Sequence, residues 1–205
     1  MTVNVELHFD VASPNIYLSH KLIPGIEERT GVKFKYVPVL LGGIFKLTGN
    51  QAPFITNQNV KNKNEYMRVE LMRFIRDHEM TNFRMNEHFP LNTVQLMRGA
   101  IVAEQEGFLD KYVDETLKDM WENSLKMDDP EVVHKAFTDH GFDADHIFSR
   151  VQEADVKEAL LANTTQSVER GIFGCPTVFV GDEMFFGKDR MVAVEQEITR
   201  QQLAG

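Results

Sequence analysis

The N-terminal segment constrains the fold most, because a strand, a helix and a second strand follow one another within fewer than 40 residues. Between residues 3 and 11, apolar and polar side chains alternate with the period of two that is typical of a β-strand. Ser13-Pro14 then predicts a helix start, since serine is a favoured N-cap and proline suits the first helical position. A second alternating segment at 32–39 completes a βαβ unit with parallel strands.

The C-terminal segment predicts two further strands and a helix. Two short apolar runs, at 177–180 and 183–186, flank a turn that contains Gly181, which is the pattern of a β-hairpin. Apolar residues at helical spacing follow over 189–203. A helix that ends near Gly171 precedes the hairpin, so the end of the chain has the order αββα.

The middle of the chain is predicted to be helical. Apolar residues recur at helical spacing over most of 63–170, whereas 41–62 is rich in Gly, Asn and Gln and is predicted as a loop or linker with at most one short helix. The order βαβ, helices, αββα is that of an α/β, thioredoxin-like fold with a large helical insertion. We therefore predict a discontinuous thioredoxin-like domain (1–45 and 165–205) and an all-helical insertion domain (46–164).

The charge and the distribution of apolar residues argue against some partners and cellular compartments. The 22 basic and 31 acidic residues give a net charge of −9, which argues against a nucleic-acid partner, since phosphate contacts need clustered Lys and Arg. The first residues lack the basic and apolar regions of a secretory signal, and no apolar run is long enough to span a bilayer. These features favour a cytoplasmic protein without membrane contact.

The single cysteine, Cys175, excludes a disulfide framework, an iron–sulfur cluster and an intramolecular CxxC redox pair. The seven histidines form no HExxH motif and no pair at helical spacing, so no metal site is expected.

Two segments suggest chemistry. Ser13 stands at a helix N-terminus, where free N–H groups and the helix dipole stabilise an anion by about 0.3–1 kcal/mol; the alternative is a serine that only caps the helix. Pro176 opens a strand. In a thioredoxin-like fold it would be cis, and Cys175 would offer its main chain to a bound thiol or peptide; the alternative is an ordinary loop proline.

Five segments together resemble the kappa-class glutathione transferases, and still more the bacterial 2-hydroxychromene-2-carboxylate isomerases of the same family. They are FDVASPN (9–15), GGIFKLTGN (42–50), HFPLN (88–92), GIFGCPT (171–177) and FFGKDRM (185–191). The resemblance covers about 1–203. It implies a thioredoxin-like fold with a helical insertion, near the disulfide-oxidoreductase branch, with serine where those enzymes carry the first cysteine of CxxC.

The resemblance also implies a glutathione site. Ser13 matches the catalytic serine that hydrogen-bonds the glutathione sulfur. Cys175, before a cis Pro176, matches the residue whose main chain pairs with the cysteinyl part, and its own thiol is not expected to be the nucleophile. The further cofactor-binding positions are Asn50, Lys63 near a carboxylate, and Lys188 and Asp189 at the γ-glutamyl end.

The implied activity is a glutathione-dependent isomerisation of the kind used in aromatic-compound catabolism. The thiolate would add to 2-hydroxychromene-2-carboxylate, allow bond rotation and leave, giving trans-o-hydroxybenzylidenepyruvate. Arg190, Lys46 and Lys63 are candidates for binding the substrate carboxylate. Asn15 and Lys188 depart from the residues that many relatives carry, so the substrate pocket is expected to differ.

Two alternatives use the same site. A kappa-like transferase or peroxidase would conjugate small electrophiles with the Ser13-activated thiolate, and a non-catalytic protein would only bind glutathione. A disulfide oxidoreductase is disfavoured because Ser13 replaces a cysteine and no CxxC exists. The expected partners are a small anionic aromatic or electrophilic substrate and, from the resemblance, a second copy of the chain in a homodimer.

Overall fold

The computed structural model describes residues 3–204, and the two ends of the chain meet in one four-stranded sheet of order β2-β1-β3-β4. The strands are β1 (Val5–Phe9), β2 (Phe34–Pro38), β3 (Thr177–Val180) and β4 (Glu183–Phe186). β1 pairs parallel with β2 and antiparallel with β3, so the N-terminal βαβ unit and the C-terminal hairpin share this sheet. The predicted thioredoxin-like α/β fold is confirmed.

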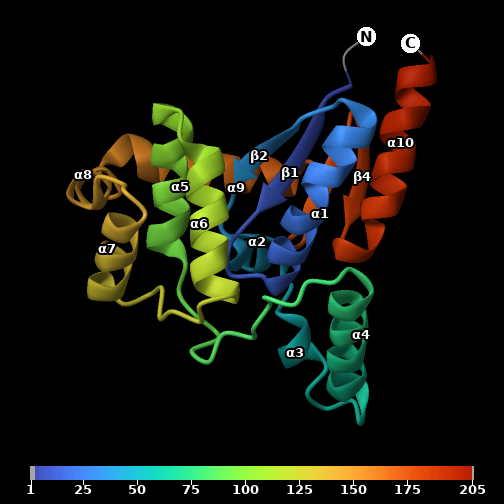
Figure 1. Cartoon of the computed structure of the whole chain (residues 1–205), viewed down its shortest axis with the longest axis horizontal. Coiled ribbons are helices and arrows are strands. Elements are labelled where there is room, and N and C mark those ends of the chain that lie inside the picture. The colour runs from blue at the N-terminus through green and yellow to red at the C-terminus, as the bar shows by residue number, and fades with distance from the viewer. Residues whose placement is uncertain (1–2, 205) are drawn as a thin grey trace.

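Helices cover the sheet and extend beyond one end of it (Figure 1). They are α1 (Pro14–Thr30), α2 (Leu41–Thr48), α3 (Pro53–Thr56), α4 (Lys63–Asp77), α5 (Val94–Glu106), α6 (Leu109–Trp121), α7 (Pro130–Asp139), α8 (Ala144–Arg150), α9 (Ala154–Glu169), the 3-10 turn η1 (Lys188–Arg190) and α10 (Met191–Ala204). α1 packs beside α10, while α9 packs against β2, α2 and α5. None of the helices within residues 3–204 combines the length and apolar character needed to cross a membrane.

The prediction of a loop over 41–62 is wrong in its first half, where α2 and α3 form two helices. Gly42 and Gly43 suggested a loop, but they lie in α2, and Gly43 allows α2 to pack closely against α9. A Cβ at Gly43 would lie 3.1 Å from the Thr164 methyl carbon of α9, and Ile44 is fully buried. Single-sequence periodicity misses α2 because it is short and its glycines are poor helix formers.

The end of α9 is tied to the sheet and to α2. The side chain of Asn163 donates to the Pro38 carbonyl, and Thr164 accepts a hydrogen bond from the Leu40 N–H. α9 runs from 154 to 169 without a break, across the predicted domain boundary at 164/165. The division into two domains stays a prediction.

α5 and α6 pack closely against each other, and both helices lie near the end of β1. Tyr112 of α6 is buried and donates to the Leu96 carbonyl of α5 over 2.9 Å. A Cβ at Gly99 would lie 2.2 Å from the Tyr112 hydroxyl oxygen, so only glycine fits there. α5 and α6 therefore pack at short range, with residues of both facing the end of β1.

A buried histidine lies on β1 beneath α9. His8 is 2% exposed, and its Nδ1 lies 2.8 Å from the Ser167 hydroxyl oxygen. Because that hydroxyl donates to the Asn163 carbonyl, the Nδ1–H of His8 must be the donor to Ser167, and Nε2 accepts from Arg170 at 3.4 Å. Burial, reinforced by the Arg170 charge, lowers the pKa of His8 to about 4.

This pKa predicts a loss of stability in mild acid. An unfolded histidine titrates near 6.5, so between that pH and about 4 the unfolded chain binds more protons, and the unfolding free energy falls as the pH falls. Between roughly pH 7 and pH 5, protonation of His8 in the unfolded chain should lower the unfolding free energy by about 2 kcal/mol. Urea unfolding at the two pH values should show a smaller fall for His8→Asn than for the wild type. The matched control, His88→Asn at an exposed position, should keep the wild-type fall. Equal falls for His8→Asn and the wild type would contradict the assignment.

Candidate functional site

Ser13 lies in the turn between β1 and α1, and its hydroxyl does not cap the helix. The residue occupies the N-cap position with extended backbone angles and is 7% exposed. Its hydroxyl instead donates to the Cys175 carbonyl over 3.3 Å. The side chain therefore makes no capping hydrogen bond and points to the loop before β3, although Ser13 keeps the N-cap position.

That loop carries a cis peptide bond between Cys175 and Pro176, as predicted. Cys175 is 6% exposed, and burial, with the nearby Asp10 carboxyl, raises the pKa of its thiol well above the usual range. The thiol therefore stays protonated. Within residues 3–204 the main-chain N–H of Cys175 has no hydrogen-bond acceptor, so the main chain is the part available to a ligand.

Two further hydrogen bonds bring predicted site residues to this loop. The Asn50 side-chain amide, after α2, donates to the Phe173 carbonyl over 2.8 Å. The Gly187 N–H donates to the Pro176 carbonyl over 2.9 Å, which places the turn 187–190 beside the loop. Gly187 has a φ of 96°, a conformation that favours glycine. We call Ser13, Asn50, Cys175, Pro176 and the turn 187–190 the Ser13 group.

Lys188, within this turn, is enclosed. It is 7% exposed, and its Nζ lies 2.5 Å from Asp189 Oδ1 and 4.3 Å from the centre of the Phe74 ring of α4. The Asp189 side chain is 67% exposed. The start of α10 lies just above α4 in Figure 1, in agreement with this contact. The two residues predicted for the γ-glutamyl end are thus paired with each other.

The remaining predicted residues are exposed or half-buried. Lys46, in the last turn of α2, Lys63 and Arg190 are exposed, and none of the three makes an ion pair within residues 3–204. Lys63 begins α4, eleven positions before Phe74, which corresponds to about 16 Å along the helix. Asn15 follows Pro14 in the first turn of α1. Arg190 belongs to the Ser13 group through its place in the turn 187–190. No hydrogen bond within 3–204 joins its side chain, or those of Lys46, Lys63 and Asn15, to the other residues of the group.

Sequence reasoning missed Asp10, which organises the turn that bears Ser13. Its carboxylate is 1% exposed and accepts from the Ala12 N–H at 2.9 Å, the Leu41 N–H at 2.7 Å and the Thr93 hydroxyl at 2.7 Å. Burial raises the pKa of Asp10, while the hydrogen bonds oppose that rise. One carboxylate thus ties the Ser13 turn to the starts of α2 and α5. A carboxylate at the end of a predicted strand was the available signal.

Trp121 was also missed as a site residue. It is fully buried at the end of α6, and its indole N–H donates to the Val11 carbonyl over 3.0 Å. The Val11 N–H in turn lies 3.5 Å from the Met97 sulfur of α5. The sequence showed Trp121 only as part of an apolar helical stripe. Both helices therefore hold the backbone of the turn before Ser13.

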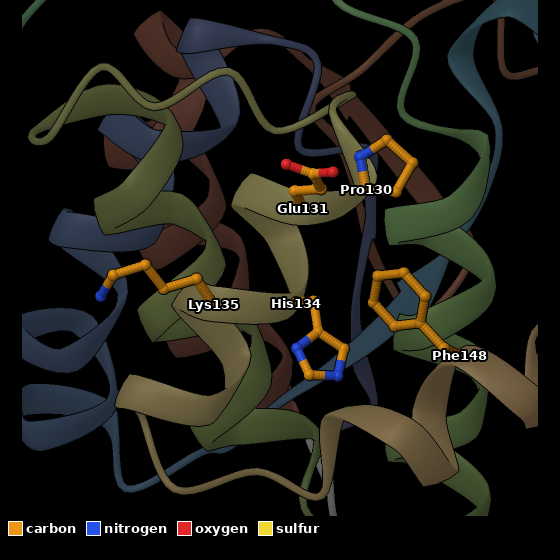
Figure 2. Close-up of a pocket in the computed structure, with 5 residues that line it drawn as sticks. All are labelled: Pro130, Glu131, His134, Lys135 and Phe148. Atoms are coloured by element: carbon orange, nitrogen blue, oxygen red, sulfur yellow. The ribbon is translucent and has the colours of Figure 1, made fainter.

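A hollow elsewhere on the molecule does not belong to this group. Figure 2 shows it between α7 and α8, with lining residues Pro130, Glu131, His134, Lys135 and Phe148. His134 is engaged with Asp145 at 2.8 Å. None of the lining residues lies in a segment that the sequence marked for function. The Ser13 group is therefore the candidate site.

A family model described as DSBA-like thioredoxin domain matches residues 4–199. The chain belongs to the DsbA-like thioredoxin family. The Ser13 group then lies where the cis-proline loop of this thioredoxin fold faces the first helix. In this DsbA-like chain, position 13 is serine and the one cysteine lies on the other side of the site, before the cis proline.

Individual relatives show which members of the DsbA-like family the chain is similar to. The chain is 26% identical to the 2-hydroxychromene-2-carboxylate isomerase of Sphingobium xenophagum over 195 residues, which covers 95% of this chain and 97% of that protein. It is 28% identical to glutathione S-transferase kappa 1 of Rattus norvegicus over 200 residues, with 91% and 87% covered. The resemblance to the isomerase and kappa-class family is confirmed.

Solved structures agree on the fold. A 2-hydroxychromene-2-carboxylate isomerase matches with a TM-score of 0.82 and 24% identity, covering 96% of this chain and 95% of that one. A probable DsbA oxidoreductase from Streptomyces coelicolor matches with a TM-score of 0.75 and 16% identity, covering 97% and 89%. The similarity therefore extends over the sheet and the helices together.

Proposed function

We propose that this chain is a glutathione-dependent isomerase that interconverts 2-hydroxychromene-2-carboxylate and trans-o-hydroxybenzylidenepyruvate. The observation that carries the proposal is the Ser13 hydroxyl, which is turned away from its helix and onto the Cys175 carbonyl beside a cis Pro176. Relatives named for this isomerase cover nearly the whole chain. A cytoplasmic location and a homodimer belong to the same proposal.

The residues of the Ser13 group fit glutathione. Within residues 3–204, Cys175 offers a main-chain N–H without a protein acceptor, next to a carbonyl whose one hydrogen bond is the long bond from Ser13. These two groups can pair with a peptide in the way that neighbouring β-strands do. Asn50 and Lys63 complete the set that would hold the tripeptide, with Asp189 and Lys188 at its γ-glutamyl end. When bound, glutathione supplies the thiolate nucleophile that the buried Cys175 cannot provide.

Ser13 stabilises the anionic form of a thiol at this position. Its hydrogen bond to the Cys175 carbonyl is 3.3 Å long, whereas O–H···O bonds are usually about 2.7–2.8 Å. The hydroxyl therefore gives up little when it donates to an anionic sulfur, and a bond to a charged acceptor is the stronger one. The N-terminus of α1 adds a favourable field, so both effects lower the pKa of a bound thiol.

The substrate carboxylate needs a cation near the sulfur. Lys46, Lys63 and Arg190 are exposed and lack acidic partners within residues 3–204. Arg190 lies in the turn that Gly187 ties to Pro176, which favours Arg190 for this role. Asn15, in the first turn of α1, would face the substrate from the other side of Ser13.

A second candidate function is transfer of glutathione to small electrophiles. The 28% identity to a kappa-class transferase favours it, and the same Ser13 would stabilise the thiolate. The two activities differ in the fate of glutathione: an isomerase regenerates it, whereas a transferase consumes it. A protein that only binds glutathione would do neither.

The deciding experiment follows the ultraviolet absorbance of 2-hydroxychromene-2-carboxylate with glutathione below the substrate concentration. The expected result is approach to the equilibrium mixture of the two isomers, with more substrate converted than glutathione present and with unchanged free thiol. Loss of thiol with an electrophile such as a chlorodinitrobenzene, and no isomerisation, would favour the transferase. Millimolar glutathione should also raise Tm, since a ligand at about 100 times its Kd stabilises by about 2.7 kcal/mol. No turnover together with no shift in Tm would overturn the site.

A further inference from the structure

Lys188 is a buried cation whose partners come from two elements. Its Nζ lies 2.5 Å from Asp189 Oδ1 and over the ring of Phe74, 4.3 Å from the centre. Asp189 is its only acidic partner within residues 3–204. A lysine head removed from water needs a paired anion, so the covering by α4 favours a lasting Lys188–Asp189 pair.

The pair lies in the Ser13 group. The Gly187 N–H fixes the start of the turn on the Pro176 carbonyl, and the turn packs against α1, which Ser13 begins. The carboxylate of Asp189 is exposed on this surface, while the ammonium of Lys188 is covered. A ligand that reaches Asp189 therefore meets a carboxylate whose charge is already balanced.

We propose that Lys188 is a specificity-determining residue: it occupies Asp189, so the site does not select its thiol by an α-ammonium group. This inference rests on the proposed function, because it concerns the γ-glutamyl end of the same glutathione site. A ligand ammonium would have to share Asp189 with Lys188 or displace it, leaving a buried cation without its acid. The class of thiol that the site takes is then a small peptide thiol with a terminal carboxylate, with or without an α-ammonium.

The neighbouring charge supports the carboxylate part of this class. Arg190 is exposed in the same turn and makes no ion pair within residues 3–204. Because the charges of Lys188 and Asp189 cancel, the turn has a net positive charge that comes from Arg190. Such a surface attracts a carboxylate and gains little from an ammonium.

The test compares two thiols on the wild-type protein by calorimetry. Glutathione is the first, and glutaryl-cysteinyl-glycine, which has hydrogen in place of the α-ammonium and keeps both carboxylates, is the second. The expected Kd ratio between them is below about threefold. A preference of the wild type for glutathione above that ratio would overturn the inference while leaving the proposed function intact. Failure of both thiols to bind would overturn the proposed function as well.

A variant then isolates the role of Lys188. Lys188→Met keeps an unbranched side chain against Phe74 and leaves Asp189 without a cation, so glutathione should gain about tenfold over the analogue. The control Lys157→Met, on α9 and without an ion pair within residues 3–204, should keep the wild-type ratio. An unchanged ratio in a folded Lys188→Met would count against the inference. The wild-type comparison decides by itself if this variant does not fold.

Discussion

Replacing Ser13 with alanine is expected to lower kcat/KM for the glutathione-dependent reaction roughly 100-fold, the range seen when one donor to a developing anion is removed. The variant loses the hydroxyl that lies beside Cys175 and keeps the backbone of the turn, which Asp10 and Trp121 hold. The pKa of the bound thiol should rise by up to about two units, the shift that corresponds to a 100-fold change, measured from the ultraviolet absorbance of the thiolate at increasing pH. The two readouts should move together, because both depend on stabilisation of the same charge.

Ser19→Ala is the matched control for this variant. Ser19 lies on the same helix, is fully buried, and its hydroxyl has no hydrogen-bond partner within residues 3–204. Removing it leaves no donor or acceptor orphaned, so activity and the thiol pKa should equal those of the wild type. Wild-type activity in Ser13→Ala, or an equal loss in both variants, would remove Ser13 from the mechanism.

The fold could be predicted because its main signals are local. The alternation at 3–11, Ser13-Pro14 and the hairpin around Gly181 each lie within a short window, and each matches an observed element. The order of the elements then leaves few topologies. α2 was missed since its Gly42-Gly43 pair has low helix propensity, and only the contact of Gly43 with Thr164, far along the chain, shows why glycine is there.

The site could be predicted only in part, for a related physical reason. Ser13 and Pro176 stand next to the start of a helix and of a strand, where local rules and the family resemblance both apply. The Lys188–Phe74 contact and the bond from Trp121 to Val11 join residues more than a hundred positions apart. Periodicity marks such side chains as apolar or charged and carries no information about which segment they touch.

Asp10→Ala is expected to lower the unfolding free energy by about 3 kcal/mol, because it leaves the Ala12 N–H, the Leu41 N–H and the Thr93 hydroxyl without their acceptor. A buried orphaned donor costs about 1–3 kcal/mol, and the Thr93 hydroxyl can rotate to another partner. Urea unfolding at neutral pH measures the loss. Activity should fall as well, since the turn that orients Ser13 loses its ties to α2 and α5.

Asp10→Asn tests the three hydrogen bonds of the carboxylate separately. Its oxygen can still accept from Ala12 and Thr93, whereas its amide N–H₂ would oppose the Leu41 N–H at the start of α2. The expected loss is therefore roughly half that of alanine. Asp128→Ala, at an exposed aspartate without an ion pair within residues 3–204, should be nearly neutral. If Asp10→Ala were as mild as this control, the carboxylate would not organise the turn, and the position of Ser13 would depend on the other contacts of the turn, among them those of Trp121 and Met97 with Val11.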